Sequence, residues 1–213
     1  MITDQLTTAW KLFDSGDAAG AEALYLQCLV HADTLENDAL SFLYMGLIYA
    51  EGFLGKFQEA RLYAKLLLQC AKNKKAMHTA LHQSGMIERM AGNYVEAMAF
   101  FRQEIALIQD AFPKDDMLFA ANLYEQGILH MNMNDLAQAR ERMQCSLTYA
   151  LASQDTMCIG CSYRGLGEIL CRSGQFSPAD TCFLNAISAF QSAGDLVAVQ
   201  EVENMRSVMK KGL

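Results

Sequence analysis

Basic residues are scarce in this chain of 213 residues. Seventeen Lys and Arg stand against 24 Asp and Glu, which gives a formal net charge of −7 and a pI near 5.1. No basic stripe is visible along the sequence. Because nucleic-acid affinity depends largely on Lys and Arg that neutralise phosphates, we expect no nucleic-acid partner.

Long apolar runs are also missing. No segment approaches the roughly 18 unbroken apolar residues of a membrane-spanning helix. The N-terminal stretch MITDQLTTAWKLFDSGD has no basic start followed by an apolar run, so it does not read as a secretory signal. Hydrophobic residues nevertheless make up 52% of the chain, which is ample for a continuous core. We expect a soluble, cytoplasmic protein that does not contact a membrane.

Metal and redox motifs are weak. The seven cysteines are scattered through apolar stretches, which fits a reducing compartment better than a disulfide framework. The pair Cys158 and Cys161 forms one CxxC with no second CxxC and no nearby histidine, which favours helix filler over a redox or zinc site. His78 and His82 have the i, i+4 spacing of metal ligands, but no further His or Cys has a predictable place beside them. We expect no metal and no cofactor.

Catalytic signatures are missing as well. No phosphate-binding loop, nucleophile elbow or paired-carboxylate motif stands out, and the glycines of SGQFSPAD and GLGE lack the strand-to-helix context of a nucleotide loop. We therefore expect a protein that is not an enzyme.

What the sequence does contain is a repeat. The short motifs SGDAAGA, LGKFQEA, AGNYVEA, MNDLAQA and SGQFSPA place a turn residue at intervals of 39, 37, 42 and 40 residues. These turn residues are Gly16, Gly55, Gly92, Asn134 and Gly174. A second set of small residues recurs at intervals of 39, 42 and 40 residues, namely Gly46, Gly85, Gly127 and Gly167. Two registers with one period predict a solenoid.

A fixed alanine follows each turn. The alanines are Ala21, Ala60, Ala97, Ala139 and Ala179, and the residues four positions later are Tyr25, Ala64, Phe101, Met143 and Phe183. Residues four apart share a helix face, so the alanine allows a second helix to approach closely while the larger residue fills the space beside it. The glycines of the other register do the same from the opposing helix. Each motif is therefore predicted to be the corner of a helical hairpin.

The quoted residues resemble the tetratricopeptide repeat (TPR) family. The resemblance rests on Phe42-x-x-Met45-Gly46-x-x-Tyr49 with Ala60-x-x-x-Ala64, and on Gly92-Asn93-Tyr94-x-x-Ala97-x-x-x-Phe101, and it covers about residues 2–192. The period near 40 exceeds the usual period of about 34. No proline closes a repeat, since Pro113 lies in a linker and Pro178 with Ser177 is predicted to start a helix. Longer repeats of this kind resemble those of kinesin light chains and bacterial peptide-sensing regulators.

We predict an all-α fold, a right-handed α-solenoid in one domain over residues 1–213. Its eleven helices are expected near 3–14, 18–32, 38–51, 56–72, 75–91, 94–110, 115–132, 135–152, 155–173, 177–192 and 195–211. The hairpin repeats span about 2–34, 38–72, 75–111, 115–152 and 155–192. The last helix, 195–211, is interpreted as a cap whose polar outer face carries Glu201, Glu203, Asn204, Arg206, Lys210 and Lys211.

The resemblance also implies a binding surface, because the first helices of TPR hairpins line a concave groove. The residues placed there are Leu43, Tyr44, Leu47, His82, Gln83, Met86, Arg89, Tyr124, Glu125, Ile128, Met131, Arg164, Glu168 and Arg172. Arg89, Arg164 and Arg172 suit a peptide that carries carboxylates, although Glu125 and Glu168 could instead neutralise them internally. The lysines of the family's chaperone-tail clamp are absent from these positions.

The leading hypothesis is a non-catalytic scaffold that binds a partner protein or peptide in the groove. The alternative is a ligand-sensing regulatory module related to bacterial peptide-pheromone receptors, in which a ligand changes the superhelix. A third possibility is a homo-oligomer formed through an exposed helical face.

Overall fold

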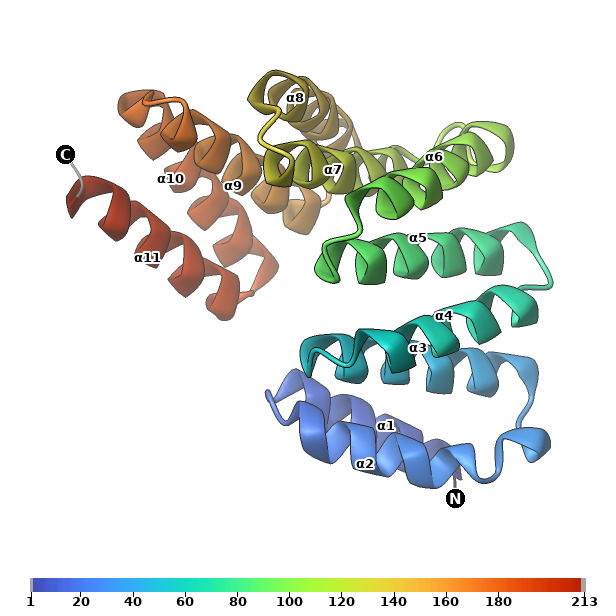
Figure 1. Cartoon of the computed structure of the whole chain (residues 1–213). Coiled ribbons are helices and arrows are strands. Elements are labelled where there is room, and N and C mark those ends of the chain that lie inside the picture. The colour runs from blue at the N-terminus through green and yellow to red at the C-terminus, as the bar shows by residue number, and fades with distance from the viewer. Residues whose placement is uncertain (1, 212–213) are drawn as a thin grey trace. The chain divides into compact units, whose positions relative to one another are not determined.

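The computed structural model describes residues 2–211, and over this range the chain forms α-helices without any strand (Figure 1). The elements are α1 (Ile2–Asp14), α2 (Ala18–Leu29), the short 3-10 helix η1 (Ala32–Thr34), α3 (Asn37–Phe53), α4 (Phe57–Cys70), α5 (Lys74–Met90), α6 (Tyr94–Ala111), α7 (Asp116–Asn132), α8 (Leu136–Ser153), α9 (Thr156–Arg172), α10 (Phe176–Ala193) and α11 (Leu196–Lys211). The predicted all-α class and the eleven α-helices are confirmed within this range.

Apart from the end of α2, every helix end lies within two residues of its predicted position. Helix α2 ends at Leu29 rather than near residue 32, because the chain then enters η1, where the Thr34 hydroxyl donates to the carbonyl of His31 at 2.8 Å. Helix α10 begins at Phe176, one residue before the predicted start, so Ser177 and Pro178 lie in its first turn. Proline is tolerated there because the first N–H groups of a helix have no intrahelical partner.

The repeated turn residues share one backbone conformation. Gly16, Gly55, Gly92, Asn134 and Gly174 all have positive φ, between 61° and 90°. This left-handed geometry closes the end of a helix and favours glycine or asparagine. At the first turn the N–H of Asp17 bonds to the carbonyl of Leu12 and the N–H of Gly16 to that of Phe13, both at 2.9 Å. The predicted hairpin corners are confirmed.

The chain divides into two compact units, residues 1–104 and 105–213. Unit 1 holds α1 to α5 and most of α6. In it α1 packs on α2 and α3 on α4, while the first helices α1, α3 and α5 contact one another in sequence. Unit 2 holds α7 to α11, with α7 against α8, α9 against α10, α7 against α9, and α11 against α10. Each unit is thus a stack of helical hairpins of the α-solenoid kind; a single domain over the whole chain stays a prediction.

Close helix crossings occur where the sequence predicted them. All five fixed alanines are 0% exposed. Within the α5–α6 hairpin, a Cβ added to Gly85 would lie 2.6 Å from the Phe101 ring, and within the α9–α10 hairpin a Cβ on Gly167 would lie 2.6 Å from the Phe183 ring. The glycine of the first helix therefore receives the large residue of the second, as expected.

The α3–α4 hairpin uses a different partner. The residue four after its fixed alanine is the small Ala64, and the space at Gly46 is filled instead by Tyr25 of the preceding hairpin, whose ring would collide with an added Cβ. Tyr25 is 0% exposed. The first two hairpins are therefore locked together by a side chain that crosses from one repeat to the next.

The predicted cap, α11, covers α10 with Ala198, Val199 and Val202. Arg206 fastens it by donating two hydrogen bonds to the carboxylate of Asp180 on α10, one at 3.0 Å from Nη2. The Lys210 ammonium lies 3.5 Å from the same carboxylate. Two residues of the predicted outward polar face, Arg206 and Lys210, therefore bind α11 to α10 as well.

Candidate binding pocket between α9 and α11

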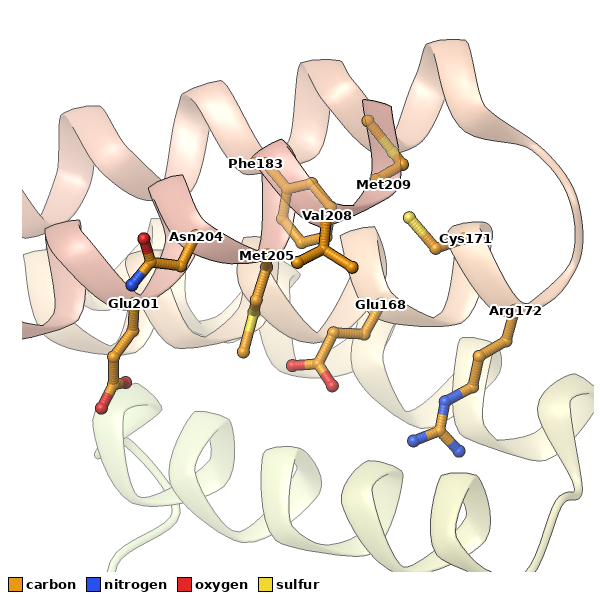
Figure 2. A pocket seen from close by; sticks show the side chains of 9 residues that line it. All are labelled: Glu168, Cys171, Arg172, Phe183, Glu201, Asn204, Met205, Val208 and Met209. Atoms are coloured by element: carbon orange, nitrogen blue, oxygen red, sulfur yellow. The ribbon is translucent and has the colours of Figure 1, made fainter. Parts of the chain in front are cut away.

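An open pocket lies between α9 and α11 in unit 2, with a volume of about 560 Å³ (Figure 2). Its lining residues are Glu168, Cys171, Arg172, Phe183, Glu201, Asn204, Met205, Val208 and Met209. Two of them, Glu168 and Arg172, were predicted to face a binding groove. Glu201 and Asn204 were assigned to the outer face of the cap; both are exposed, and they also line the pocket.

The floor of the pocket is apolar. Phe183 is 2% exposed and is the same ring that fills the space at Gly167. Met205 and Met209 pack against the core around it, whereas Val208 is 72% exposed and stands at the mouth. The spacing of Glu201, Met205 and Val208 places them on one side of α11, since residues three and four apart are neighbours on a helix.

Arg164 is held by its surroundings rather than directed at solvent. Its Nη2 donates to the Tyr124 hydroxyl at 2.7 Å, and its Nη1 lies 3.5 Å from Glu201 Oε2. The guanidinium carbon lies 5.9 Å from the centre of the Phe190 ring, within cation–π range. Burial raises the pKa of Tyr124 to about 12, so its hydroxyl remains protonated. The Arg164 side chain is therefore packed among residues of unit 2 and does not extend into solvent.

Arg172 and Glu168 are exposed to the pocket to different degrees. Arg172 is exposed and donates from Nη1 to the carbonyl of Met131 at 3.1 Å. Glu168 is partly buried and forms no hydrogen bond or ion pair with any residue between 2 and 211. Burial raises the pKa of its carboxyl group, while Arg164 and Arg172 lower it. A carboxylate without a partner thus lies beside an apolar floor.

The other unit 2 candidates lie deeper. Glu125 is 6% exposed and Met131 is 3% exposed. Ile128 packs on the core cluster that contains Met131. Along this part of the chain the structure brings Tyr124, Arg164 and Glu201 together, and Glu168 and Arg172 line the pocket beside them.

The candidates on α3 lie in the core of unit 1. Leu43 and Leu47 are 0% exposed, and Tyr44 is 8% exposed with its ring 6.3 Å from that of Tyr63. These residues were expected to flank the packing glycine Gly46 and to face a groove. Leu43 and Leu47 instead share its buried face.

On α5 the placement is mixed. Gln83 is buried and donates to the Tyr49 hydroxyl at 2.9 Å, whereas Met86 and Arg89 are partly exposed. His78 and His82 both approach one oxygen of the buried Glu104, each at 3.0 Å. Glu104 lies on α6, far along the sequence, so the i, i+4 pattern did not reveal it. Within residues 2–211 no group of three or more His, Cys, Asp or Glu is arranged to hold a metal.

A cluster of aromatic rings in unit 1 was missed by the sequence reasoning. Trp10 lies 5.9 Å from Phe13, 5.9 Å from Phe42 and 5.7 Å from Tyr49, between ring centres. Phe13 also meets Phe53, which is 71% exposed. The sequence analysis gave Trp10 no role, although the aromatic side chains of the first two repeats were an available signal.

The CxxC pair has poor redox chemistry. Burial, followed by the charge of Asp155, raises the pKa of Cys158 to about 12, and burial also raises the pKa of Cys161. Because the thiolate is the reactive form, these thiols are weak nucleophiles, in agreement with their interpretation as helix filler.

Comparison with solved structures identifies the fold. A thermophilic TPR protein from Thermus thermophilus is 16% identical, with a TM-score of 0.66 and coverage of 98% of both chains. The TPR-like repeats of a putative kinesin light chain from Podospora anserina are also 16% identical, with a TM-score of 0.67, covering 91% of this chain and 96% of that one. A signal-transduction ATPase with a tetratricopeptide repeat sensor, from Pyrococcus horikoshii, gives a TM-score of 0.72 at 16% identity.

The last comparison covers 96% of this chain but only 32% of the ATPase, so the likeness concerns one part of that protein. No family model matches the sequence, and no curated protein sequence matches it. The chain has the fold of TPR-repeat proteins, including repeats of the kinesin-light-chain kind, as the sequence resemblance predicted. Within residues 2–211 no helix is long and apolar enough to cross a membrane.

Proposed function

We propose that this chain is a non-catalytic interaction scaffold that binds a peptide segment of a partner protein in the pocket between α9 and α11. The observation that supports it is an open pocket with an apolar floor and a charged rim, lined by residues of α9, α10 and α11. Methionine and aromatic side chains beside such a rim are typical of protein interfaces. The TPR-like fold favours a protein partner, and a cytoplasmic location remains part of this proposal.

The site suits a side chain that inserts between two helices. Met205 and Met209 have flexible side chains that adapt to different shapes, while Phe183 gives a fixed base fastened by core packing. Interface affinity concentrates in a few anchors that fill such pockets. One inserted side chain would therefore supply much of the binding free energy.

A phage-displayed library of random linear peptides, selected on the full chain, tests the proposal. We expect enriched peptides whose affinity falls about tenfold or more in Val208→Lys, because a positive charge at the mouth opposes insertion of an apolar side chain and repels a basic one. The matched control is Leu151→Lys, which alters an apolar residue of α8 that is 51% exposed. Equal affinity of the selected peptides for both variants would exclude the pocket as their site.

The alternative function is a ligand-sensing module. It is supported by likeness of fold to a protein whose repeats are described as a sensor, and by a pocket whose walls belong to the α9–α10 hairpin and to the cap helix α11. In that case a selected peptide would change the angle between α9 and α11. A shift in the spin-label distance between cysteines introduced at Gln175 and Ser207 on peptide binding would favour sensing, and an unchanged distance would favour a rigid scaffold.

A further inference from the structure

We propose that the pocket between α9 and α11 is selective for a basic side chain of the partner, a lysine or arginine whose methylene stem lies on the apolar floor and whose charge meets Glu168. This inference rests on the proposed function and specifies the chemistry of the partner segment. The sequence alone favoured the opposite charge, because it counted arginines without showing which of them were already engaged.

The charges around the pocket are unequally satisfied. Arg164 is occupied by the Tyr124 hydroxyl and by Glu201, and Arg172 by the carbonyl of Met131. Glu168 has no such partner among the described residues. In Figure 2 its carboxylate points away from α9 into the space beneath Met205. Arg164 and Arg172 act on this carboxylate at longer range, because they lower its pKa, but neither is bonded to it, so its oxygens remain available to a ligand.

The surfaces beside Glu168 fit the stem of a basic side chain. Met205 and Val208 approach from α11, and Phe183 lies behind them (Figure 2). Lysine and arginine bury three or four methylene groups along apolar surface while their charged ends reach a polar group. A purely apolar ligand would cover Glu168 without pairing it, which carries a desolvation penalty.

An anionic ligand would meet the wrong charges. It would lie beside the carboxylates of Glu168 and Glu201, and like charges at short range disfavour each other. Arg172 stands at one end of the pocket and offers the only exposed guanidinium among its lining residues. Selectivity for a carboxylate would consequently have to depend on Arg172, and this makes the two possibilities separable by mutation.

The experiment uses three probes of equal chain length: n-hexylammonium, hexan-1-ol and hexanoate. The full chain is labelled with ¹³C at the methionine methyl groups, and the signals of Met205 and Met209 are assigned from the variants Met205→Leu and Met209→Leu. These two signals report directly on the pocket. We expect both signals to shift with all three probes. The affinity for hexylammonium should be about tenfold above that for hexanol, and hexanoate should bind most weakly.

The charge variants separate the contributions. Glu168→Gln keeps the size and shape of the side chain, and we expect it to abolish the preference for hexylammonium over hexanol. Arg172→Gln is the matched control on the same helix, and we expect it to retain that preference. Circular dichroism and the methyl signals of methionines outside the pocket establish that both variants are folded.

Each other outcome overturns something specific. Equal affinities for hexylammonium and hexanol in the unmodified protein overturn the selectivity for basic groups while leaving the pocket intact. If the protein instead prefers hexanoate and Arg172→Gln removes that preference, the pocket selects a carboxylate and the proposed selectivity for basic groups is wrong. If no probe shifts the signals of Met205 and Met209, the pocket itself is not a binding site and the proposed function fails.

Discussion

The two units are built by the same packing and present different chemistry. In unit 1 the first helices α1 and α3 carry the aromatic cluster of Trp10, Phe13, Phe42, Tyr49 and Phe53. In unit 2 the first helices α7 and α9 carry Tyr124, Arg164, Glu168 and Arg172, and α11 completes a pocket beside them. Alanine and glycine at the helix crossings are common to both.

This difference shows which positions the repeat fixes and which it leaves open. Small residues at the crossings are needed wherever two helices approach closely, because interiors are packed to high density. Residues on the first helices away from these crossings contact one another between repeats, as Trp10 contacts Phe42 and Arg164 contacts Tyr124, but their identity differs between the units. The shared positions therefore determine stability, and the variable positions determine what each unit can bind.

The largest expected effect concerns a buried carboxylate of unit 1. Glu51 is 2% exposed on α3, and burial, followed by the nearby Glu22, raises its pKa to about 7. Glu22 is itself bound by the Lys56 ammonium, at 2.7 Å from Oε2. At the corresponding position of the α9 repeat, five residues after the packing glycine, unit 2 has the exposed Arg172.

Glu51 should make the stability of the protein depend on pH. Its folded-state pKa lies above the unfolded value of 4.5. The folded state is therefore favoured when this carboxyl group is protonated. That stability is fully present below pH 4.5 and is lost as the pH rises through 7. We expect Glu51→Gln to be more stable than the unmodified protein by roughly 3 kcal/mol at pH 8 and to differ little at pH 4. Urea unfolding at a series of pH values measures this.

The control for this experiment is Glu59→Gln, which removes an exposed carboxylate of the neighbouring α4. Glu59 is the weakest of the charges that raise the pKa of Glu51, so this variant should keep most of the pH dependence of the unmodified protein. If Glu51→Gln shows the same pH dependence as the unmodified protein, the carboxylate is hydrated in solution and this contrast between the units disappears.

The second prediction tests the shared packing. Ala97 in unit 1 and Ala139 in unit 2 are both 0% exposed at close crossings, so Ala97→Phe and Ala139→Phe should each lower the free energy of unfolding by about 1 to 3 kcal/mol through overpacking. The exposed neighbours Ala99 and Ala137 provide matched controls as Ala99→Phe and Ala137→Phe. A variant at either buried site that melts like its control would show that its unit is packed differently.

Much of the fold could be predicted because its signals are local and repeated. The left-handed turn residues and the buried alanines each recur with one period, and a pattern repeated in this way is hard to obtain by chance. The prediction that each packing glycine meets a large residue of its own hairpin fails at Gly46, and it fails because the pattern is local. Ala64 occupies the place of a large residue, so the ring that fills the gap comes from another repeat, and no pattern within one hairpin indicates Tyr25.

The candidate site was much less predictable. The family resemblance placed Glu168 and Arg172 on a groove, and both line the pocket, but it also placed Leu47 there, which is core. The state of each charge depends on partners distant in sequence, such as Tyr124 for Arg164 and Met131 for Arg172. The second wall of the pocket comes from α11, whose Glu201 and Asn204 were interpreted as part of an outward face.

The third prediction compares two tyrosine hydroxyls on first helices. Tyr124 in unit 2 accepts a hydrogen bond from a charged donor, Arg164, at 2.7 Å, and Tyr49 in unit 1 accepts one from a neutral donor, Gln83, at 2.9 Å. Hydrogen bonds that involve a charged group contribute more than neutral ones. We expect Tyr124→Phe to cost about 2 kcal/mol and Tyr49→Phe about 1 kcal/mol in chemical denaturation. The reverse order would mean that Arg164 is already satisfied by solvent.

The smallest expected difference concerns how the two units unfold. Trp10 is the only tryptophan of the chain and lies in the aromatic cluster of unit 1, so its fluorescence reports that unit, whereas helical circular dichroism reports both. Helix α6 runs from Tyr94 to Ala111 and so crosses the boundary between Glu104 and Ile105 without a break. Breaking one unit should expose the turns of α6 that belong to it and weaken the remainder of the same helix.

We therefore expect the melting midpoints from Trp10 fluorescence and from circular dichroism to agree within about 2 °C, as in a cooperative transition. The stronger form of the test uses Ala139→Phe, whose substitution lies in unit 2. It should lower the midpoint of the Trp10 signal as much as that of circular dichroism. A Trp10 midpoint that stays at the value of the unmodified protein would show that the units unfold independently, and the comparison between them would then concern two domains rather than two parts of one solenoid.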